Sequence, residues 1–467
     1  MTSPTRPYAE ESFAEALADL LRREQGDPLG RIRLSDFFKR VEGWEYETLR
    51  KQVVSERKLQ PEAIEAMAQA LAVQPEYFIE YRRHQIERAI TVHPELVDLV
   101  YDLLVTRAKS FEAMVAPTVT HALELMVNGQ DLDLDLACKV LELIVQGQVG
   151  DVQAAAFLSV LRARGETSEQ LVGLARALRR TGERVEVNVA EPLVDIASAG
   201  GGIDYPVTFN ISTVAALVAA GAGVRVAKHG NRGQTSQAGA AELMEALGAR
   251  IDLGPAALAH SIEQLNFAFL FSPMHYPVVR HLASIRRSLG IRTIFSFLGP
   301  LSNPAGAKRQ LTGVCERKYV RLLAQALLRL GSEHALVVHG ANGLDEISVV
   351  APTTVVEVRD GEISEEFVIT PEDLGLPRHA PPSMEGGDPA RNAVMAKRVL
   401  SGEPGAALDV VLANAGAAIY LSGLASSIAE GVEQARTAVH SGRAWDTMTN
   451  YVEFTKQADR YPLEVSV

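Results

Sequence analysis

From about residue 194 onward, short apolar runs alternate with alanine-rich stretches, and this alternation limits the chain to few folds. Val224–Ala227 and Ala335–Val338 have the length and composition of buried strands, whereas Val214–Ala220 has the composition of a helix. Strands that alternate with helices form a parallel or mixed sheet with helices packed on its faces. We therefore expect an α/β domain over residues 193–467.

Ahead of this domain, the apolar residues recur at helical spacing. Residues 118–192 contain amphipathic segments, such as the one from Ala137 to Ile144, separated by glycine and polar turns. This pattern predicts a small helical domain, with return helices contributed from near residues 276–290. Residues 86–117 are expected to form a helical connector.

Residues 1–85 predict a separate all-α module. The segment Glu62–Leu71, followed by Pro75–Phe78, is similar to the helix-turn-helix domains of small repressors. The expected recognition helix, Glu45–Val54, contains basic residues but also acidic residues near its N-terminus, where they would repel phosphate. Two interpretations stay open: a DNA-binding module, or a module that only packs or dimerises.

The overall charge and the cysteines exclude several classes of protein. The formal net charge of -12 at pH 7 argues against bulk attraction to nucleic acid. Cys138 and Cys315 are far apart and have neither metal-binding nor redox spacing. No signal segment opens the sequence, and no apolar run reaches membrane-spanning length. We therefore expect a cytoplasmic protein without a membrane partner.

Two segments of the α/β region have residues suited to binding phosphate groups. Three consecutive glycines, Gly200 to Gly202, follow a strand-like run and would let backbone N–H groups approach an anion closely. Asn210, Ser212 and Thr213 begin the alanine-rich helix, where free N–H groups and the helix dipole favour an anion. Plain helix capping would use the same side chains.

Further segments combine charged and hydrogen-bonding side chains after strands. In the run K-H-G-N-R at 228–232, Lys228 would supply a point charge for pyrophosphate, and Asn231 could bind an amine or a carboxylate. An arginine near 286–292 could clamp a carboxylate through two parallel hydrogen bonds. Asp345 and Glu346 follow another strand and suit Mg2+, although an isolated pair of this kind is more often a solvated turn.

Taken in order, these motifs resemble those of the anthranilate phosphoribosyltransferase family. The chain reads T-F-N-I-S-T at 208–213, K-H-G-N-R at 228–232, L-G-P-L-S-N-P at 298–304 and H-G-A-N-G-L-D-E at 339–346. The similarity covers residues 118–457 and implies a small helical domain hinged to a larger α/β domain of the nucleoside phosphorylase type, in a homodimer formed through the helical domain. It also implies a Mg2+-dependent pentosyltransferase of tryptophan biosynthesis, which joins anthranilate or a related aromatic acid to phosphoribosyl pyrophosphate and releases pyrophosphate.

The resemblance also implies roles for individual residues. The catalytic residues would be Lys228, Asn231 and Arg286. The phosphates and ribose would be held by Gly200, Gly201, Asn210, Ser212, Thr213, Lys228 and Ser236. The anthranilate channel would be lined by His229, Asn231, Arg286 and Gly299. Mg2+ would be bound, directly or through water, by Ser212, Asp345 and Glu346.

The glycine-rich loop departs from the family pattern. The family's loop reads G-T-G-G-D-G, whereas residues 198–203 read S-A-G-G-G-I, so Ala199 removes a hydroxyl and Gly202 removes a carboxylate. This departure and the N-terminal module support a second hypothesis: a transcriptional regulator in which a transferase-like domain senses phosphoribosyl pyrophosphate or an aromatic metabolite. A third hypothesis, nonspecific binding of nucleic acid by that domain, is disfavoured by the acidic balance.

Overall fold

The computed structural model describes two compact units, Met1–Ala113 and Met114–Val467. The described residues are 17, 41, 60–71, 73–92, 118–199, 208–233, 237–276, 285, 288–291, 293–381 and 384–458.

In the first unit, the described residues form α4 (Pro61–Ala70), η1 (Pro75–Tyr77) and α5 (Ile79–Val92). Pro61 occupies the first turn of α4, where the missing N–H costs nothing. The expected helix Glu62–Leu71 is therefore confirmed to within one residue. The expected recognition helix and most of the expected connector lie outside the described residues, so the helix-turn-helix assignment stays a prediction.

A helical bundle opens the second unit. It contains a helix over residues 118–127, followed by α8 (Leu134–Val145), α9 (Asp151–Arg164) and α10 (Ser168–Thr181). The Asp133 carboxylate caps α8 by accepting from the Leu136 N–H at 2.7 Å, and Thr167 with Gln170 forms a capping box at α10. Helices α8 and α10 pack closely because Gly173 has no side chain, and a Cβ there would lie 3.1 Å from the Leu134 carbonyl oxygen.

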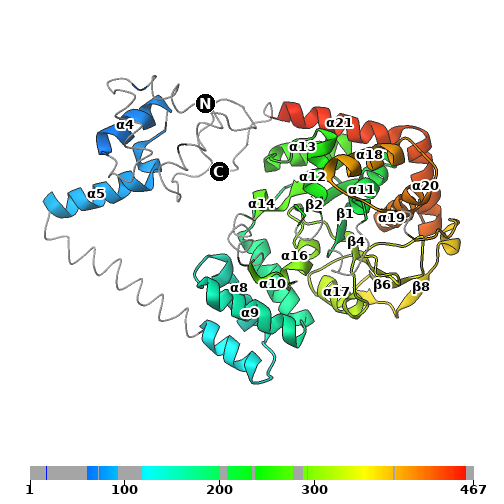
Figure 1. Cartoon of the computed structure of the whole chain (residues 1–467), viewed down its shortest axis with the longest axis horizontal. Coiled ribbons are helices and arrows are strands. Elements are labelled where there is room, and N and C mark those ends of the chain that lie inside the picture. The colour runs from blue at the N-terminus through cyan, green and yellow to red at the C-terminus, as the bar shows by residue number, and fades with distance from the viewer. Residues whose placement is uncertain are drawn as a thin grey trace. The chain divides into compact units, whose positions relative to one another are not determined.

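The rest of the unit is an α/β domain built on one mixed sheet (Figure 1). Its strands are β1 (Leu193–Ser198), β2 (Arg225–Gly230), β3 (Phe267–Phe271), β4 (Arg309–Gly313), β5 (His334–Gly340), β6 (Thr353–Arg359), β7 (Glu362–Ile363) and β8 (Phe367–Ile369). Its helices are α11 (Ile211–Gly221), α12 (Ala240–Leu247), α13 (Pro255–Leu265), α14 (Ser272–His275), α16 (Phe295–Leu301), α17 (Lys318–Arg329), η3 (Glu372–Leu374), α18 (Pro389–Leu400), α19 (Ala406–Ser422), α20 (Ile428–His440) and α21 (Arg443–Gln457).

The sheet order is β3-β2-β1-β4-β5-β6-β7, with β8 also paired to β6. Strands β3, β2, β1, β4 and β5 are parallel, whereas β6 to β8 are antiparallel. The chain progresses from β1 through β2 to β3 on one side and then continues with β4 on the other side of β1. In such sheets, ligands bind outside the carboxyl ends of the strands at the point where the order reverses.

Alternate residues along the strands enter two separate cores. Leu336 and Val338 belong to one core, with residues of α11, α18, α19, α20 and α21. Ala335 and Val337 belong to the other core, with residues of α16, α17 and the helical bundle. Helices therefore cover both faces of the sheet, as Figure 1 shows, and the expected combination of a helical domain with an α/β domain is confirmed.

One side chain sets the start of a helix beside the site. Helix α12 begins at Ala240. The Glu242 side chain explains this start, because it accepts from the N–H groups of Gly239 and Gly233 at 3.0 and 3.1 Å. The carboxylate therefore fastens the preceding loop to the helix and satisfies the N–H of the residue at the helix cap.

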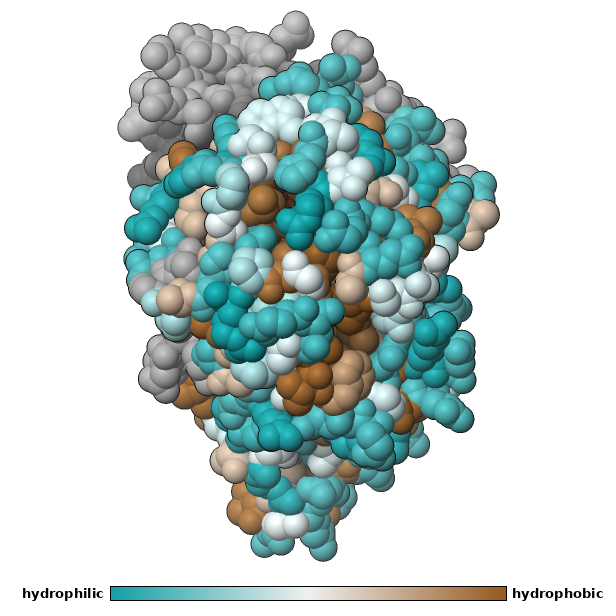
Figure 2. Space-filling view, turned by 90° about the vertical axis from the view of Figure 1, so that its right-hand side faces the viewer, coloured by the Kyte–Doolittle hydropathy of each residue, from teal (hydrophilic) through white to brown (hydrophobic). Residues whose placement is uncertain are grey.

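The surface in Figure 2 is mostly hydrophilic, with smaller apolar areas between the polar side chains. In the part of the chain that the structure describes, no helix is long and apolar enough to cross a membrane.

Helices α19 and α20 approach so closely that glycine is required on both. A Cβ at Gly431 would lie 2.2 Å from the Gly416 carbonyl oxygen. We expect Gly431→Ala to lower the free energy of unfolding in urea by roughly 1–3 kcal/mol, because the backbones of the two helices must separate. Gly150→Ala is the matched control, since no atom lies within 4 Å of its Cβ position. Equal stability of the two variants would contradict the close-packing argument.

Candidate active site

Several of the singled-out side chains meet at the carboxyl ends of β1, β2 and β4. The Ser198 hydroxyl, at the end of β1, donates to the Asp345 carboxylate on the loop between β5 and β6. The backbone of Asp345 lies against Gly313, the last residue of β4, where a Cβ would be only 1.6 Å from the Asp345 carbonyl oxygen. The Ala199 N–H also donates to the Gly313 carbonyl at 2.9 Å. Asp345 is therefore held at the point where the strand order reverses.

The Glu346 carboxylate lies at the N-terminus of α11. Its side chain is 6% exposed, and it accepts from both the N–H and the hydroxyl of Ser212. Burial, followed by the neighbouring charge of Asp345, raises the pKa of Glu346 well above its usual value, while Lys228 and Ser212 act in the opposite direction. A further positive group at this point would therefore relieve the repulsion between the two carboxylates.

Lys228 is a buried cation between two carboxylates. Its side chain is 3% exposed, and its Nζ donates to the His229 carbonyl oxygen at 3.0 Å. Burial lowers the pKa of Lys228, whereas the charges of Asp195 and Glu346 raise it. Lys228, which the sequence predicts to bind phosphate, and Glu346, which it predicts to bind Mg2+, are thus neighbours.

An asparagine on α19 fixes the loop that carries the two carboxylates. The Asn414 carboxamide accepts from the Ile347 N–H at 2.9 Å and donates to the Ile347 carbonyl at 3.0 Å. It also donates to Val410 within its own helix at 2.8 Å. The loop after β5 is therefore anchored directly behind Asp345 and Glu346.

The donor set at this point is compatible with Mg2+. Two adjacent carboxylates and the Ser212 hydroxyl supply oxygen atoms, which Mg2+ prefers, and substrate phosphates with water usually complete its coordination. Among the described residues, no group of three or more His, Cys, Asp or Glu side chains could hold a metal. The arrangement therefore suits a cation that is shared with a phosphorylated ligand better than one enclosed by protein alone.

Two buried histidines line the adjacent part of the site. His229 Nδ1 is 2.9 Å from the Gly299 carbonyl oxygen, and His275 Nδ1 is 3.1 Å from the Glu183 carbonyl oxygen. A carbonyl can only accept, so each Nδ1 carries the proton and each Nε2 presents a lone pair. Both Nε2 atoms are buried without a hydrogen-bond partner among the described residues. Burial lowers the pKa of both imidazoles to about 4, so both rings are neutral.

The ring of Tyr276 packs beside the ring of His229. The two ring centroids are 6.1 Å apart in an edge-on arrangement, and the Tyr276 hydroxyl donates to the Ser302 carbonyl at 2.5 Å. A Cβ at Gly182 would lie 2.1 Å from the Tyr276 ring, so the end of the helical bundle packs directly on this tyrosine.

Asp195 and Asn303 form a buried pair to which the sequence motifs assigned no role. Asp195 accepts from the His229 N–H at 3.1 Å and from Asn303 Nδ2 at 2.8 Å. Asn303 Nδ2 also donates to the Ala227 carbonyl at 2.8 Å. The available signal was a lone carboxylate within the apolar run L-V-D-I-A of β1, since an ionised group is rarely buried without partners.

Asn210 occupies the cap position of α11, but its side chain does not cap the helix. Its carboxamide donates to the Ala238 carbonyl at 3.1 Å and accepts from Asn392 Nδ2 at 3.0 Å, while Asn392 Oδ1 accepts from the Gly387 N–H at 2.8 Å. Ser212 and Thr213 lie within the first turn, and Thr213 Oγ1 is buried without a partner among the described residues. Ser212 and Thr213 therefore do not cap α11.

The remaining predicted site residues differ in how they are placed. The Asn231 side-chain oxygen accepts from the Arg232 N–H at 2.7 Å, while the exposed Arg232 side chain forms two hydrogen bonds with Glu245. The Gly299 carbonyl faces His229. Four predicted site residues lie outside the described residues: Gly200, Gly201, Ser236 and Arg286.

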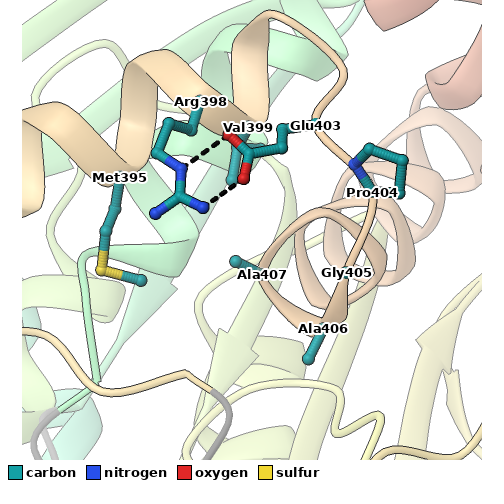
Figure 3. Close-up of a pocket in the computed structure, with 8 residues that line it drawn as sticks. All are labelled: Met395, Arg398, Val399, Glu403, Pro404, Gly405, Ala406 and Ala407. Carbon is teal, nitrogen blue, oxygen red and sulfur yellow. Dashed lines mark hydrogen bonds and ion pairs between the residues drawn. The ribbon is translucent and has the colours of Figure 1, made fainter.

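A pocket between α18 and α19 is separate from this site (Figure 3). Arg398 crosses it and pairs through two hydrogen bonds with Glu403, as the dashed lines show. Its lining consists of Met395, Arg398, Val399, Glu403, Pro404, Gly405, Ala406 and Ala407. None of these residues belongs to the predicted site, and the ion pair satisfies both charged groups.

Comparison with known proteins identifies both domains of the second unit. Residues 190–445 match the α/β domain of the glycosyl transferase family, and residues 120–182 match its helical bundle domain. An anthranilate phosphoribosyltransferase of Rubrobacter xylanophilus is 48% identical over 338 residues, which are 72% of this chain and 97% of the relative. One from Thermomicrobium roseum is 46% identical over 71% of this chain and 95% of the relative.

Solved structures give the same result. The chain is similar to anthranilate phosphoribosyltransferase of Thermus thermophilus, with a TM-score of 0.67 and 41% identity over 72% of this chain and 99% of that one. It is also similar to the Saccharomyces cerevisiae enzyme in complex with PRPP and Mg, with a TM-score of 0.67 and 26% identity over 73% of this chain and 98% of that one.

The neutral histidines make the stability of the fold depend on pH. A histidine whose folded pKa is about 4 binds its proton more weakly than the unfolded chain does, so stability is lost as the pH falls from about 6.5 toward about 4. At about pH 5, each such histidine lowers the free energy of unfolding by about 2 kcal/mol relative to neutral pH. We expect His275→Asn, which keeps an N–H donor for the Glu183 carbonyl but cannot titrate, to reduce this loss. Urea unfolding at both pH values measures it, and an unchanged loss in the variant would contradict the assignment.

Proposed function

We propose that this chain, which belongs to the anthranilate phosphoribosyltransferase family of glycosyl transferases, transfers the phosphoribosyl group of phosphoribosyl pyrophosphate to the amine of anthranilate. The observation that carries the proposal is the cluster of Lys228, Ser212, Asp345 and Glu346 at the reversal point of the sheet. A buried cation beside oxygen ligands for a metal suits a substrate with several phosphates. The relatives named for this activity match the chain over nearly their own full length.

The reaction needs charge stabilisation more than it needs a strong base. The bond between the ribose carbon and the pyrophosphate oxygen breaks, and the electron pair leaves with pyrophosphate. The amine nitrogen forms the new bond to that carbon and then loses a proton. Lys228 and the N-terminus of α11 would stabilise the negative charge that grows on the leaving group, because both lie beside Glu346. Mg2+ at Ser212, Asp345 and Glu346 would add to this neutralisation when bound.

The histidines suit the acceptor amine. His229 Nε2 presents a buried lone pair without a partner among the described residues, which could accept a hydrogen bond from an aromatic amine and so orient it toward the ribose carbon. Because its pKa is about 4, the ring stays neutral at neutral pH and keeps this lone pair available. We propose that Asn231, Arg286 and Gly299 line the same channel, as the family resemblance implies.

The unusual glycine-rich loop is compatible with this activity. Ala199 lacks the hydroxyl of the family's loop, but Ser198, one residue earlier, donates its hydroxyl to Asp345. We infer that Ser198 helps to orient the metal-binding carboxylate. Gly200, Gly201 and Ser236 keep their proposed roles in holding the phosphates and ribose.

No observation favours the regulator hypothesis over the enzyme. The expected recognition helix lies outside the described residues, and the relatives compared with this chain are named as transferases. DNA binding by the N-terminal module therefore stays a prediction, which a salt-dependent shift of a DNA probe would support.

We also propose a homodimer formed through the helical bundle. Val127 and Val152 on the bundle are 69% and 83% exposed, and a partner that covered them would bury apolar surface. Light scattering tests this proposal, and a monomeric mass would rule it out.

The proposed activity can be measured directly. Mixed with phosphoribosyl pyrophosphate, anthranilate and Mg2+, the purified chain should consume anthranilate, seen as loss of its fluorescence, and release an equal amount of pyrophosphate. Omission of Mg2+ should stop both changes. Pyrophosphate release without loss of anthranilate would point to another acceptor, and no release at all would overturn the proposed function.

Variants of the charged cluster should separate its roles. We expect Lys228→Ala to lower kcat/KM by roughly 10²-fold or more, because a preorganised positive charge at the leaving group is lost. Asp345→Asn with Glu346→Gln should raise the Mg2+ concentration needed for half-maximal rate. Lys308→Ala is the matched control, because Lys308 is exposed next to Glu333, just before β4 begins. Unchanged kinetics in both site variants would contradict these roles.

A further inference from the structure

The sheet opens between β1 and β2 just before the site. The two strands pair only at Leu193 with Arg225 and at Val194 with Val226, although both strands continue toward their carboxyl ends. The next residue of β1 is Asp195, whose carboxylate accepts from the His229 N–H at 3.1 Å. A side chain therefore takes the place of the missing backbone partner and spans the gap between the strands.

The same carboxylate ties a third segment to this gap. Asn303, just after α16, donates to Asp195 at 2.8 Å and to the Ala227 carbonyl at 2.8 Å, and its own oxygen accepts from the Ala305 N–H at 2.9 Å. Within α16, the Gly299 carbonyl holds Nδ1 of the His229 ring. The ring of His229 is thus held directly by this segment, and its backbone is held by Asp195, which the same segment binds.

Charge explains why a carboxylate is needed here rather than an amide. Asp195 is fully buried, and burial raises its pKa, while Lys228 and the hydrogen bonds from Asn303 and the His229 N–H lower it. An uncharged Asn at this position would present an N–H toward the N–H groups of Asn303 or His229. The two hydrogen bonds therefore require two acceptor oxygens, and the buried cation favours a negative charge on them.

We propose that Asp195 is a positioning residue for the transfer reaction: by bridging β1, β2 and the Asn303 segment, it sets the place of Lys228 and the orientation of the His229 ring. Because Asp195 is fully buried, it acts through these two side chains. The kinetic part of this proposal rests on the proposed function, whereas the orientation of His229 does not depend on it.

Asp195→Asn in the full-length chain tests the proposal. We expect kcat to fall about 10²-fold, with a much smaller change in KM for phosphoribosyl pyrophosphate, because displacement by about 1 Å has an effect of this size on positioned reactants. Ser261→Ala is the matched control for lost stability, since its buried hydroxyl bonds the Phe267 carbonyl at 2.7 Å at the start of β3, the end remote from the site. A kcat for Asp195→Asn no lower than that of Ser261→Ala would overturn the proposal.

A second measurement needs no substrate. In protein labelled with 15N-histidine, with the His229 signals assigned by His229→Gln, the unsubstituted chain should show a single tautomer protonated at Nδ1. Asp195→Asn should give a mixture of tautomers, whereas Ser261→Ala should leave the signals unchanged. If Asp195→Asn does not fold, Asn303→Ala is expected to cause the same changes to a smaller extent. An unaltered tautomer in these variants would overturn the proposal, and an inactive unsubstituted chain would overturn only the proposed function.

Discussion

The burial of the Lys228 ammonium group is the constraint on which the site depends. A cation removed from water is costly unless opposite charges accompany it, and each of those charges needs hydrogen-bond donors of its own. Asp195 and Glu346 supply the charges, and their donors come from β2, from the segment after α16 and from the start of α11. A parallel sheet makes this arrangement available, because the carboxyl ends of its strands lie at one edge.

The parts of the fold that sequence could predict are those with local signals. The apolar runs at β2 and β5 and the alanine-rich α11 have a period or a composition that identifies them without their neighbours. The ordered motifs identified the family, which comparison with relatives confirmed. The start of α12 at Ala240 has no such local signal, because its cap depends on Glu242 reaching back to Gly233, which no helical period reveals.

The supporting residues of the site were harder to predict, since their partners are distant in sequence. Asp195 and Asn303 are 108 residues apart, and Asn414 holds an Ile347 that is 67 residues away. Asp195 stands out as a lone carboxylate in the apolar run of β1, but the sequence does not show which groups it meets. The glycine-rich loop shows the same limit: Ala199 lacks the family's hydroxyl, but the neighbouring Ser198 hydroxyl donates to Asp345, a partner that is 147 residues away.

The attachment of the carboxylate loop to α19 also determines when the site can appear during synthesis. Strands β1 and β2 leave the ribosome long before Asn414, which anchors the loop of Asp345 and Glu346. Contacts that join distant parts of a chain form late, after the intervening segments are available. A nascent chain that has not reached α19 therefore holds every charged residue of the cluster but lacks the side chain that anchors the loop of Asp345 and Glu346.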